Sequence, residues 1–169
     1  MHSNIIICGD IQVGKSTLVN ALIDKIQKPV SGFITKSLND NGCGYHEIFM
    51  YSPKDPSNRR LLAICEGEKV EVYSNVFDTF GCELLSQISS DDIVVMDEIG
   101  FMEEKSEKFK NKVLEILDGN IPVIAAVKSG HPDSEFLNSV RNSKNALLYF
   151  ITKENRDNLL NKIVKEQLS

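Results

Sequence analysis

Residues 9–17 read GDIQVGKST and directly follow the apolar run IIIC at residues 5–8. Gly9, Gly14, Lys15 and Ser16 fit the pattern G-x-x-x-x-G-K-[ST], and the apolar-rich run LVNALI comes next. Glycine allows the backbone angles that turn successive N–H groups inward, and the positive end of a following helix points to the same place. The stretch therefore predicts a phosphate-binding loop between a buried strand and a helix.

Each position of this loop is expected to contact the phosphates of a nucleotide. Lys15 can neutralise charge on the β- and γ-phosphates, and Ser16 can ligate Mg²⁺. Thr17 either contacts the α-phosphate or only begins the helix. The nucleotide-binding residues predicted in this stretch are Gly9, Asp10, Ile11, Gln12, Val13, Gly14, Lys15, Ser16 and Thr17.

Two acidic residues follow a second buried strand. In DDIVVMDEIG, residues 91–100, Asp97 and Glu98 come directly after the apolar run of residues 93–96. Open α/β sheets place ligand groups at the carboxyl ends of their strands. Asp97 is therefore a predicted Mg²⁺ ligand, and Glu98 is predicted to orient or deprotonate the water that attacks the γ-phosphate. A glutamate in that place also suggests another strand between the P-loop strand and the strand that bears Asp97.

The remaining chain alternates buried strands with helices, except in one block. Strands are expected at residues 4–8, 93–96, 121–127 and 146–151, and helices at 16–27, 75–88, 104–118, 132–141 and from about 154. Residues 30–74 instead contain β-rich runs around NDNG and GEK, which predict an antiparallel meander. We expect one domain over residues 1–169. Its fold class is α/β, a three-layer P-loop NTPase fold with a mostly parallel sheet, helices on both faces and the meander inserted at one edge.

Composition excludes several classes of function. The chain has 169 residues and a net charge of −5, so no overall basic field attracts nucleic acid. The four cysteines form no CxxC pair, which argues against a zinc or redox motif. The start of the chain has neither a basic leader nor a long apolar stretch. We therefore expect a cytoplasmic protein without a membrane partner, acting as a monomer or weak oligomer.

Three stretches resemble one known family. DEIGFMEEKSEKF, residues 97–109, resembles the signature D-E-I-G-x-M-E-x-x-S-x-x-F of the small P-loop nucleoside-triphosphatases called cancer-related NTPases. SGFITKSLNDNGCGY, from residue 31, resembles the family's G-F-x-T segment, and ITKENRDNL, from residue 151, resembles its V-T-x-x-N-R-D-x-L segment. The resemblance implies hydrolysis of several nucleoside triphosphates and a nucleotide-binding role for Asn155 and Arg156. These two residues equally fit a helix start capped by Thr152.

The chain departs from the family pattern at Ser37, where a glutamate is usual. Arginine is sparse, so no lid or finger arginine can be assigned, and we expect slow turnover. The four arginines are Arg59, Arg60, Arg141 and Arg156. The first two lie in a polar segment that could fold over the nucleotide.

Three residues of the signature have more than one interpretation. Glu103 fits either a supporting position in the site or a solvent-exposed surface. Ser106 and Phe109 fit a helix cap and a core position better than a role in the site.

The function predicted from these patterns is Mg²⁺-dependent hydrolysis of the terminal phosphate of ATP, GTP or other nucleoside triphosphates, slow and with broad base specificity. Two alternatives remain open. One is a small-molecule or nucleotide kinase, with the meander supplying the acceptor site, and the other is a nucleotide-binding switch with negligible turnover. The N-K-x-D motif of guanine selection is missing from VKSGHPD, residues 127–133, so strict guanine specificity is unsupported.

Overall fold

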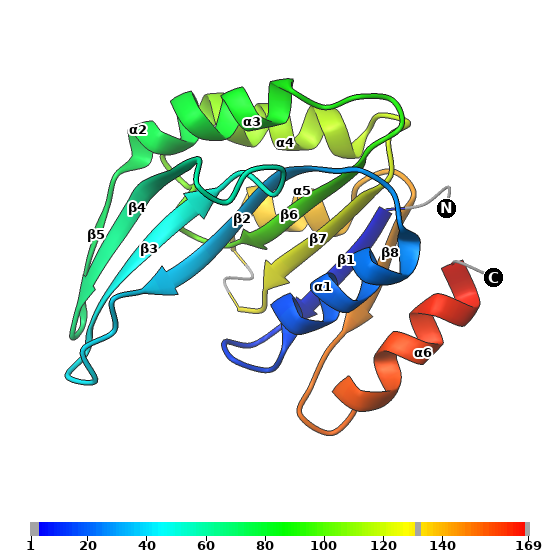
Figure 1. The fold of residues 1–169 in the computed structure, drawn as a ribbon, viewed down its shortest axis with the longest axis horizontal. Coiled ribbons are helices and arrows are strands. Elements are labelled where there is room, and N and C mark those ends of the chain that lie inside the picture. The colour runs from blue at the N-terminus through cyan, green and yellow to red at the C-terminus, as the bar shows by residue number, and fades with distance from the viewer. Residues whose placement is uncertain (1–3, 131–132, 168–169) are drawn as a thin grey trace.

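All strands of the described chain belong to one mixed sheet (Figure 1). The computed structural model describes residues 4–130 and 133–167. Within that part of the chain the sheet has eight strands in the order β5-β4-β3-β2-β6-β7-β1-β8. The strands are β1 (Asn4–Gly9), β2 (Val30–Leu38), β3 (Tyr45–Tyr51), β4 (Arg59–Glu66), β5 (Lys69–Val72), β6 (Ile93–Ile99), β7 (Val123–Lys128) and β8 (Ala146–Phe150).

Five neighbouring strands, β2, β6, β7, β1 and β8, run parallel. β7 lies between β1 and β6, which confirms the additional strand suggested by the pair Asp97–Glu98. Every residue of β1 is buried, as expected for a parallel strand with helices on both faces. Because these strands are parallel, the carboxyl ends of β1, β7 and β6 lie side by side at the same end of the sheet.

The predicted meander is confirmed, and it extends the sheet at one side. β2, β3, β4 and β5 pair in antiparallel hairpins, while β2 also pairs in parallel with β6. β2 is therefore both the last strand of the parallel part and the first strand of the meander. Two of the three hairpin loops contain Gly42 and Gly67, whose φ angles are 71° and 61°.

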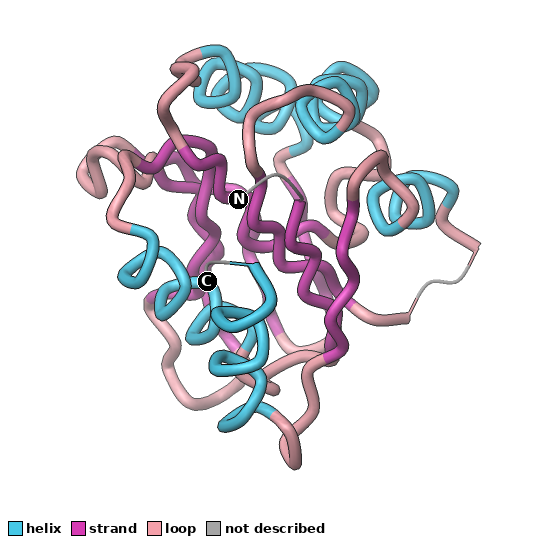
Figure 2. Tube along the Cα trace, turned by 90° about the vertical axis from the view of Figure 1, so that its right-hand side faces the viewer, coloured by secondary structure: helices cyan, strands magenta, loops and turns pink. Residues whose placement is uncertain are grey.

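Helices cover both faces of the sheet (Figure 2). One face carries α1 (Lys15–Ile26) and α6 (Arg156–Gln167). The other carries α2 (Ser74–Val76), the π-helical turn η1 (Phe77–Gly81), α3 (Cys82–Ser86), α4 (Glu107–Leu117) and α5 (Glu135–Arg141). The start expected at residue 132 lies outside the described residues. None of the described helices has the length and apolar character needed to cross a bilayer.

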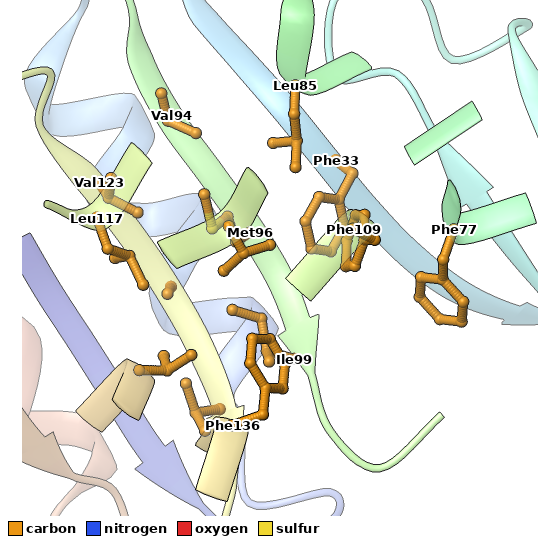
Figure 3. Close-up of a cluster of buried hydrophobic side chains, with 14 of the residues drawn as sticks. Phe33, Phe77, Leu85, Val94, Met96, Ile99, Phe109, Leu117, Val123 and Phe136 are labelled. Atoms are coloured by element: carbon orange, nitrogen blue, oxygen red, sulfur yellow. The ribbon is translucent and has the colours of Figure 1, made fainter. Parts of the chain in front are cut away.

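The larger hydrophobic core lies between the sheet and α3, α4 and α5 (Figure 3). Phe109 is fully buried there, with its ring centroid 5.3 Å from that of Phe33 and 5.1 Å from that of Phe77. A Cβ atom at Gly81 would lie 2.7 Å from the Phe109 ring, so only glycine fits at this point of the helix. The core role predicted for Phe109 is confirmed.

Candidate active site

The loop between β1 and α1 requires glycine for two different reasons. A Cβ atom at Gly9 would lie 2.6 Å from Cγ2 of Ile151 and 2.9 Å from Cγ2 of Val13. Gly14 has φ 108° and immediately precedes α1. A helix leaves its first N–H groups without intrahelical acceptors, so the first turn of α1 offers them to an anion at the loop.

Lys15 is the buried cation of this loop, with only 4% of its surface exposed. Its ammonium donates hydrogen bonds to the carbonyl oxygens of Gly9 and Asp10, at 2.9 and 2.6 Å. It also forms an ion pair with Oε2 of Glu98 at 2.9 Å. The lysine thus lies folded back over the loop and ties it to the end of β6.

Ser16 and Asp97 make the second link between the two motifs. The Ser16 hydroxyl donates a hydrogen bond to Oδ1 of Asp97 at 3.1 Å, across 81 residues of sequence. Asp97 is 2% exposed; its burial raises the pKa of the carboxyl to about 6, and the bond from Ser16 acts in the opposite direction. A hydroxyl and a carboxylate oxygen are the donors that a hard cation such as Mg²⁺ prefers.

Glu98 lies where β6 departs from regular pairing. The register of β6 against β7 shifts between Asp97 and Ile99. The N–H of Glu98 donates to Oγ1 of Thr35 at 3.2 Å, and Oε1 lies 3.7 Å from the ammonium of Lys128. Its side chain is 26% exposed and pairs with Lys15 of α1 and Lys128 of β7, while its backbone N–H is bonded to Thr35 of β2.

Residue-by-residue reasoning missed the roles of Thr35 and Lys128 beside Glu98. Thr35 entered only as part of the G-F-x-T resemblance. Lys128 could have been found, because it directly follows the predicted strand of residues 121–127, at the edge where ligand groups of such sheets collect.

Glu103 is fully buried beneath the Glu98 loop, so its solvent-exposed interpretation was wrong. Both of its carboxylate oxygens accept the N–H of Gly100, at 3.3 and 3.1 Å. Burial raises the pKa of Glu103 to about 7, while these hydrogen bonds and the charge of Lys128 act against the rise. The carboxyl group fixes the turn that follows β6.

Ser106 is the N-cap residue of α4, as predicted, but its hydroxyl makes no capping hydrogen bond. The hydroxyl donates instead to the carbonyl oxygen of Ser74 at 3.0 Å. It thereby connects the start of α4 to α2, so Ser106 holds the predicted cap position while its side chain bonds elsewhere.

The opposite side of the phosphate loop borders a cavity of about 320 Å³. Its lining residues are Gly14, Thr17, Leu18, Ala21, Ile151, Arg156, Asp157 and Leu160. The Arg156 side chain lies 3.8 Å from the position of a Cβ at Gly14. Thr17, in the first turn of α1, faces this cavity, so both interpretations of Thr17 are compatible with its position.

Asn155 has a clear part in shaping the turn before α6. Its Oδ1 accepts the N–H of Thr152 at 2.9 Å, and its Nδ2 donates to the carbonyl of Phe150 at 2.8 Å. The Thr152 hydroxyl in turn accepts the N–H of Asn155 at 3.4 Å. The helix-start interpretation therefore accounts for Asn155, whereas Arg156 lies beside the phosphate loop.

The middle of the phosphate loop differs in exposure from its ends. Asp10, Ile11 and Gln12 are exposed, and Val13 is buried. The Asp10 carboxylate accepts a hydrogen bond from the hydroxyl of Ser129. That bond connects the loop to the segment that follows β7.

Arg59 and Arg60 do not lie in a loop over the site. They begin β4, where the Arg59 guanidinium lies over the rings of Phe49 and Tyr51, at 5.1 and 5.8 Å from their centroids. Arg60 lies over the ring of Phe80 on the other side of the sheet, at 4.8 Å. The prediction of a polar loop at these two residues was wrong, because the paired strand and the aromatic rings hold both side chains.

Known proteins with this arrangement match the chain over almost its full length. Residues 4–164 match the family described as NTPase. Nucleoside-triphosphatase THEP1 of Methanocaldococcus jannaschii is 30% identical, with 98% of this chain and 97% of the relative covered. Its counterpart from Thermotoga sp. strain RQ2 is 28% identical, with 95% and 92% covered.

Two solved structures share the fold. The crystal structure of THEP1 from Aquifex aeolicus superimposes with a TM-score of 0.78 at 25% identity, covering 96% of this chain and 98% of that one. The solution structure of a human cancer-related nucleoside triphosphatase gives a TM-score of 0.75 at 24% identity, covering 99% and 98%. The family match, the full-length relatives and the fold agree with the two joined motifs: the chain belongs to the NTPase family of P-loop nucleoside-triphosphatases.

Proposed function

We propose that this chain hydrolyses the terminal phosphate of nucleoside triphosphates with Mg²⁺, and that Gly9–Thr17, Asp97 and Glu98 form the active site. One observation carries the proposal. Lys15 and Ser16 of the phosphate loop contact Glu98 and Asp97 at the end of β6, at 2.9 and 3.1 Å. A phosphate-binding loop and a carboxylate for water activation therefore lie within one side-chain length of each other.

The protein contributes placement and charge in this reaction. The N–H groups of the loop and of the first turn of α1 bind the phosphate oxygens, and Lys15 turns from Glu98 to the β- and γ-phosphates. Glu98, freed from Lys15, orients the attacking water or accepts its proton. Stabilising charge in a site that is already organised supplies most of the rate in phosphoryl transfer.

Ser16 and Asp97 are the residues that would hold Mg²⁺, which supplies positive charge to the phosphate oxygens. Their oxygen donors suit this ion, and the buried Asp97 carboxyl has Ser16 as its close polar partner. Among the described residues, no group of three or more His, Cys, Asp or Glu side chains is arranged to hold a metal alone. The ion would therefore take its remaining ligands from the nucleotide and from water.

The cavity beside Gly14 is the place proposed for the sugar and base. Arg156 and Thr17 are its polar groups next to the loop, and Leu18, Ala21 and Leu160 are among its apolar ones. An apolar surface with few fixed polar groups supports broad base specificity. We propose that the whole chain acts as one domain, slowly, and as a monomer or weak oligomer.

The test is a phosphate-release assay with ATP, GTP, CTP and UTP in the presence of Mg²⁺ and without any acceptor, together with Lys15→Ala. We expect release from several of the four nucleotides, and a loss of at least about 100-fold in Lys15→Ala. Formation of nucleoside diphosphate only after addition of an acceptor, with the phosphate bound to that acceptor and none set free, would instead indicate a kinase. Tight binding without release would indicate a switch. Either result would overturn the proposal.

A further inference from the structure

Lys128 ends the strand that separates the two halves of the site. β7 lies between β1 and β6, and Lys128 is paired in register with Gly9, the first residue of the phosphate loop. Position alone thus puts a cation between the phosphate loop and the carboxylates. The roles proposed above do not use it.

The side chain of Lys128 is held along its length. Its Cδ atom lies 3.3 Å from the position of a Cβ at Gly100, so the stem packs closely against this glycine. Its ammonium lies over the ring of Phe101, 4.7 Å from the centroid, and the side chain is 17% exposed. At the backbone, the Lys128 carbonyl accepts a hydrogen bond from the Arg141 guanidinium at 2.8 Å.

Glu98 therefore lies between two ammonium groups, one on each oxygen. Lys15 is 2.9 Å from Oε2, and Lys128 is 3.7 Å from Oε1. The two lysines differ in what else they can reach. Lys15 belongs to the phosphate loop and must turn to the phosphates when a nucleotide binds, whereas Lys128 is kept near Glu98 by Gly100 and Phe101.

The arginines of the chain have other partners. Arg59 and Arg60 lie over aromatic rings of the meander and of η1, and Arg141 donates to the backbone at the end of β7. Arg156 lies on the far side of the loop, beside Gly14. Lys128 is thus the cation, within the described chain, that contacts Glu98 besides Lys15.

We infer that Lys128 is a positioning residue for the hydrolytic reaction: it holds the Glu98 carboxylate against β7 once Lys15 has moved to the phosphates. The inference rests on the proposed function. An unheld carboxylate at the end of a strand could follow Lys15 toward the nucleotide or swing into solvent. A displacement of about 1 Å from the attacking water is enough to reduce the rate as much as 100-fold.

The test is a double-mutant cycle with Lys128→Met and Glu98→Gln. kcat and KM are measured by phosphate release with saturating Mg²⁺, and folding is checked by circular dichroism. We expect Lys128→Met to lower kcat about 10- to 100-fold in the wild-type chain while KM changes less than about 3-fold. In the Glu98→Gln background the same substitution should have almost no further effect, because the group it positions is gone. Lys128→Arg should recover most of kcat.

A matched control uses another lysine that pairs with a carboxylate. Lys112 forms an ion pair with Glu115 at 3.1 Å on α4, so Lys112→Met should leave kcat unchanged. An equal loss from Lys128→Met in both backgrounds would overturn the inference, since the lysine would then act independently of Glu98. Wild-type turnover with an unaffected Lys128→Met variant would overturn the inference alone. No turnover by the wild type would overturn the proposed function and the inference together.

Discussion

Glycines occur both in the parallel part of the sheet and at the tips of the meander, but those in the parallel part are tightly enclosed, whereas those at the tips have open space around them. A Cβ atom at Gly32, on β2, would lie 2.1 Å from the carbonyl oxygen of Val95, and Gly9 is similarly enclosed. At Gly42 and Gly67, in the hairpin loops, nothing lies within 4 Å of an added Cβ. Gly32 is required by close packing against the neighbouring strand β6, and Gly9 by close packing against Ile151 and Val13. Gly42 and Gly67 are required only by the backbone angle of a turn.

The burial of charged side chains also differs between the phosphate-loop end of the sheet and the meander. At the carboxyl ends of the parallel strands, around the phosphate loop, Lys15, Asp97 and Glu103 are buried, each less than 5% exposed. Strand β5, at the far edge of the meander, carries its polar residues in solvent, including Lys69 and Glu71. Desolvating a charge is costly unless it is paired, so the buried charges mark the part of the sheet where the structure is organised for chemistry.

The largest effect is expected on kcat, from a substitution among the charged residues around the phosphate loop. Glu98→Gln should lower kcat about 100- to 1,000-fold, because an amide cannot accept the proton of the attacking water. Affinity for Mg²⁺–nucleotide should change less than about 3-fold, measured by calorimetric titration. Glu104→Gln is the matched control, since Glu104 is an exposed glutamate a few residues away. Equal phosphate release from wild type and Glu98→Gln would remove Glu98 from this role.

The comparison of glycines predicts two unequal losses of stability. Gly32→Ala must push against the Val95 carbonyl and adopt φ near 100°, which should lower the free energy of unfolding by about 3 kcal/mol or more. In Gly67→Ala the added Cβ meets no neighbour, so only the φ angle near 61° is unfavourable, and the free energy of unfolding should fall by about 1 kcal/mol. Urea unfolding of the two variants measures the difference. Similar losses would show that the crowding at Gly32 is relieved by a small strand movement.

A smaller effect on stability than that of Gly32→Ala is a pH dependence that originates at Glu103. Its pKa in the folded protein is about 7, above the ordinary value, so between these two pKa values the folded state keeps a proton that the unfolded state has lost. Stability should therefore fall as the pH rises through this range. Lys128 and Glu98 are the charged groups that act on it.

The glutamine in Glu103→Gln cannot ionise, so this variant should not show the loss of stability that Glu103 causes as the pH rises. Between about pH 5 and about pH 8, the wild type should lose on the order of 2 kcal/mol relative to the variant. Urea unfolding at several pH values gives this difference directly. Parallel pH curves for the two proteins would mean that Glu103 is ionised throughout in the folded state.

Both halves of the predicted site could be located in the sequence because each is a local pattern. The glycines and lysine of GDIQVGKST and the acidic pair after IVVM have their meaning within a few residues, and the rule for open α/β sheets brings their strand ends to one edge. The hairpin of NDNG and the meander were predicted for the same reason. The partners of Glu98 were not local: Thr35 is 63 residues away, and the contact of Lys128 depends on which strand lies between β1 and β6.

The wrong predictions concern residues whose burial and contacts depend on the tertiary structure. Arg59 and Arg60 looked like part of a polar loop, but strand pairing with β3 and the rings of Phe49, Tyr51 and Phe80 hold them. Glu103 looked like one of several acidic residues after the strand, and only the turn at Gly100 makes it a buried acceptor.

The amino-acid sequence by itself determined the phosphate loop, the acidic end of β6, the alternation of strands and helices, and the antiparallel block, since these depend on residue chemistry and periodicity over short distances. The tertiary structure alone decided which side chains meet Glu98, which charges are buried and where the arginines lie. Those contacts follow from strand order and register, and a shift of one residue in register would turn the same side chains to the other face of the sheet.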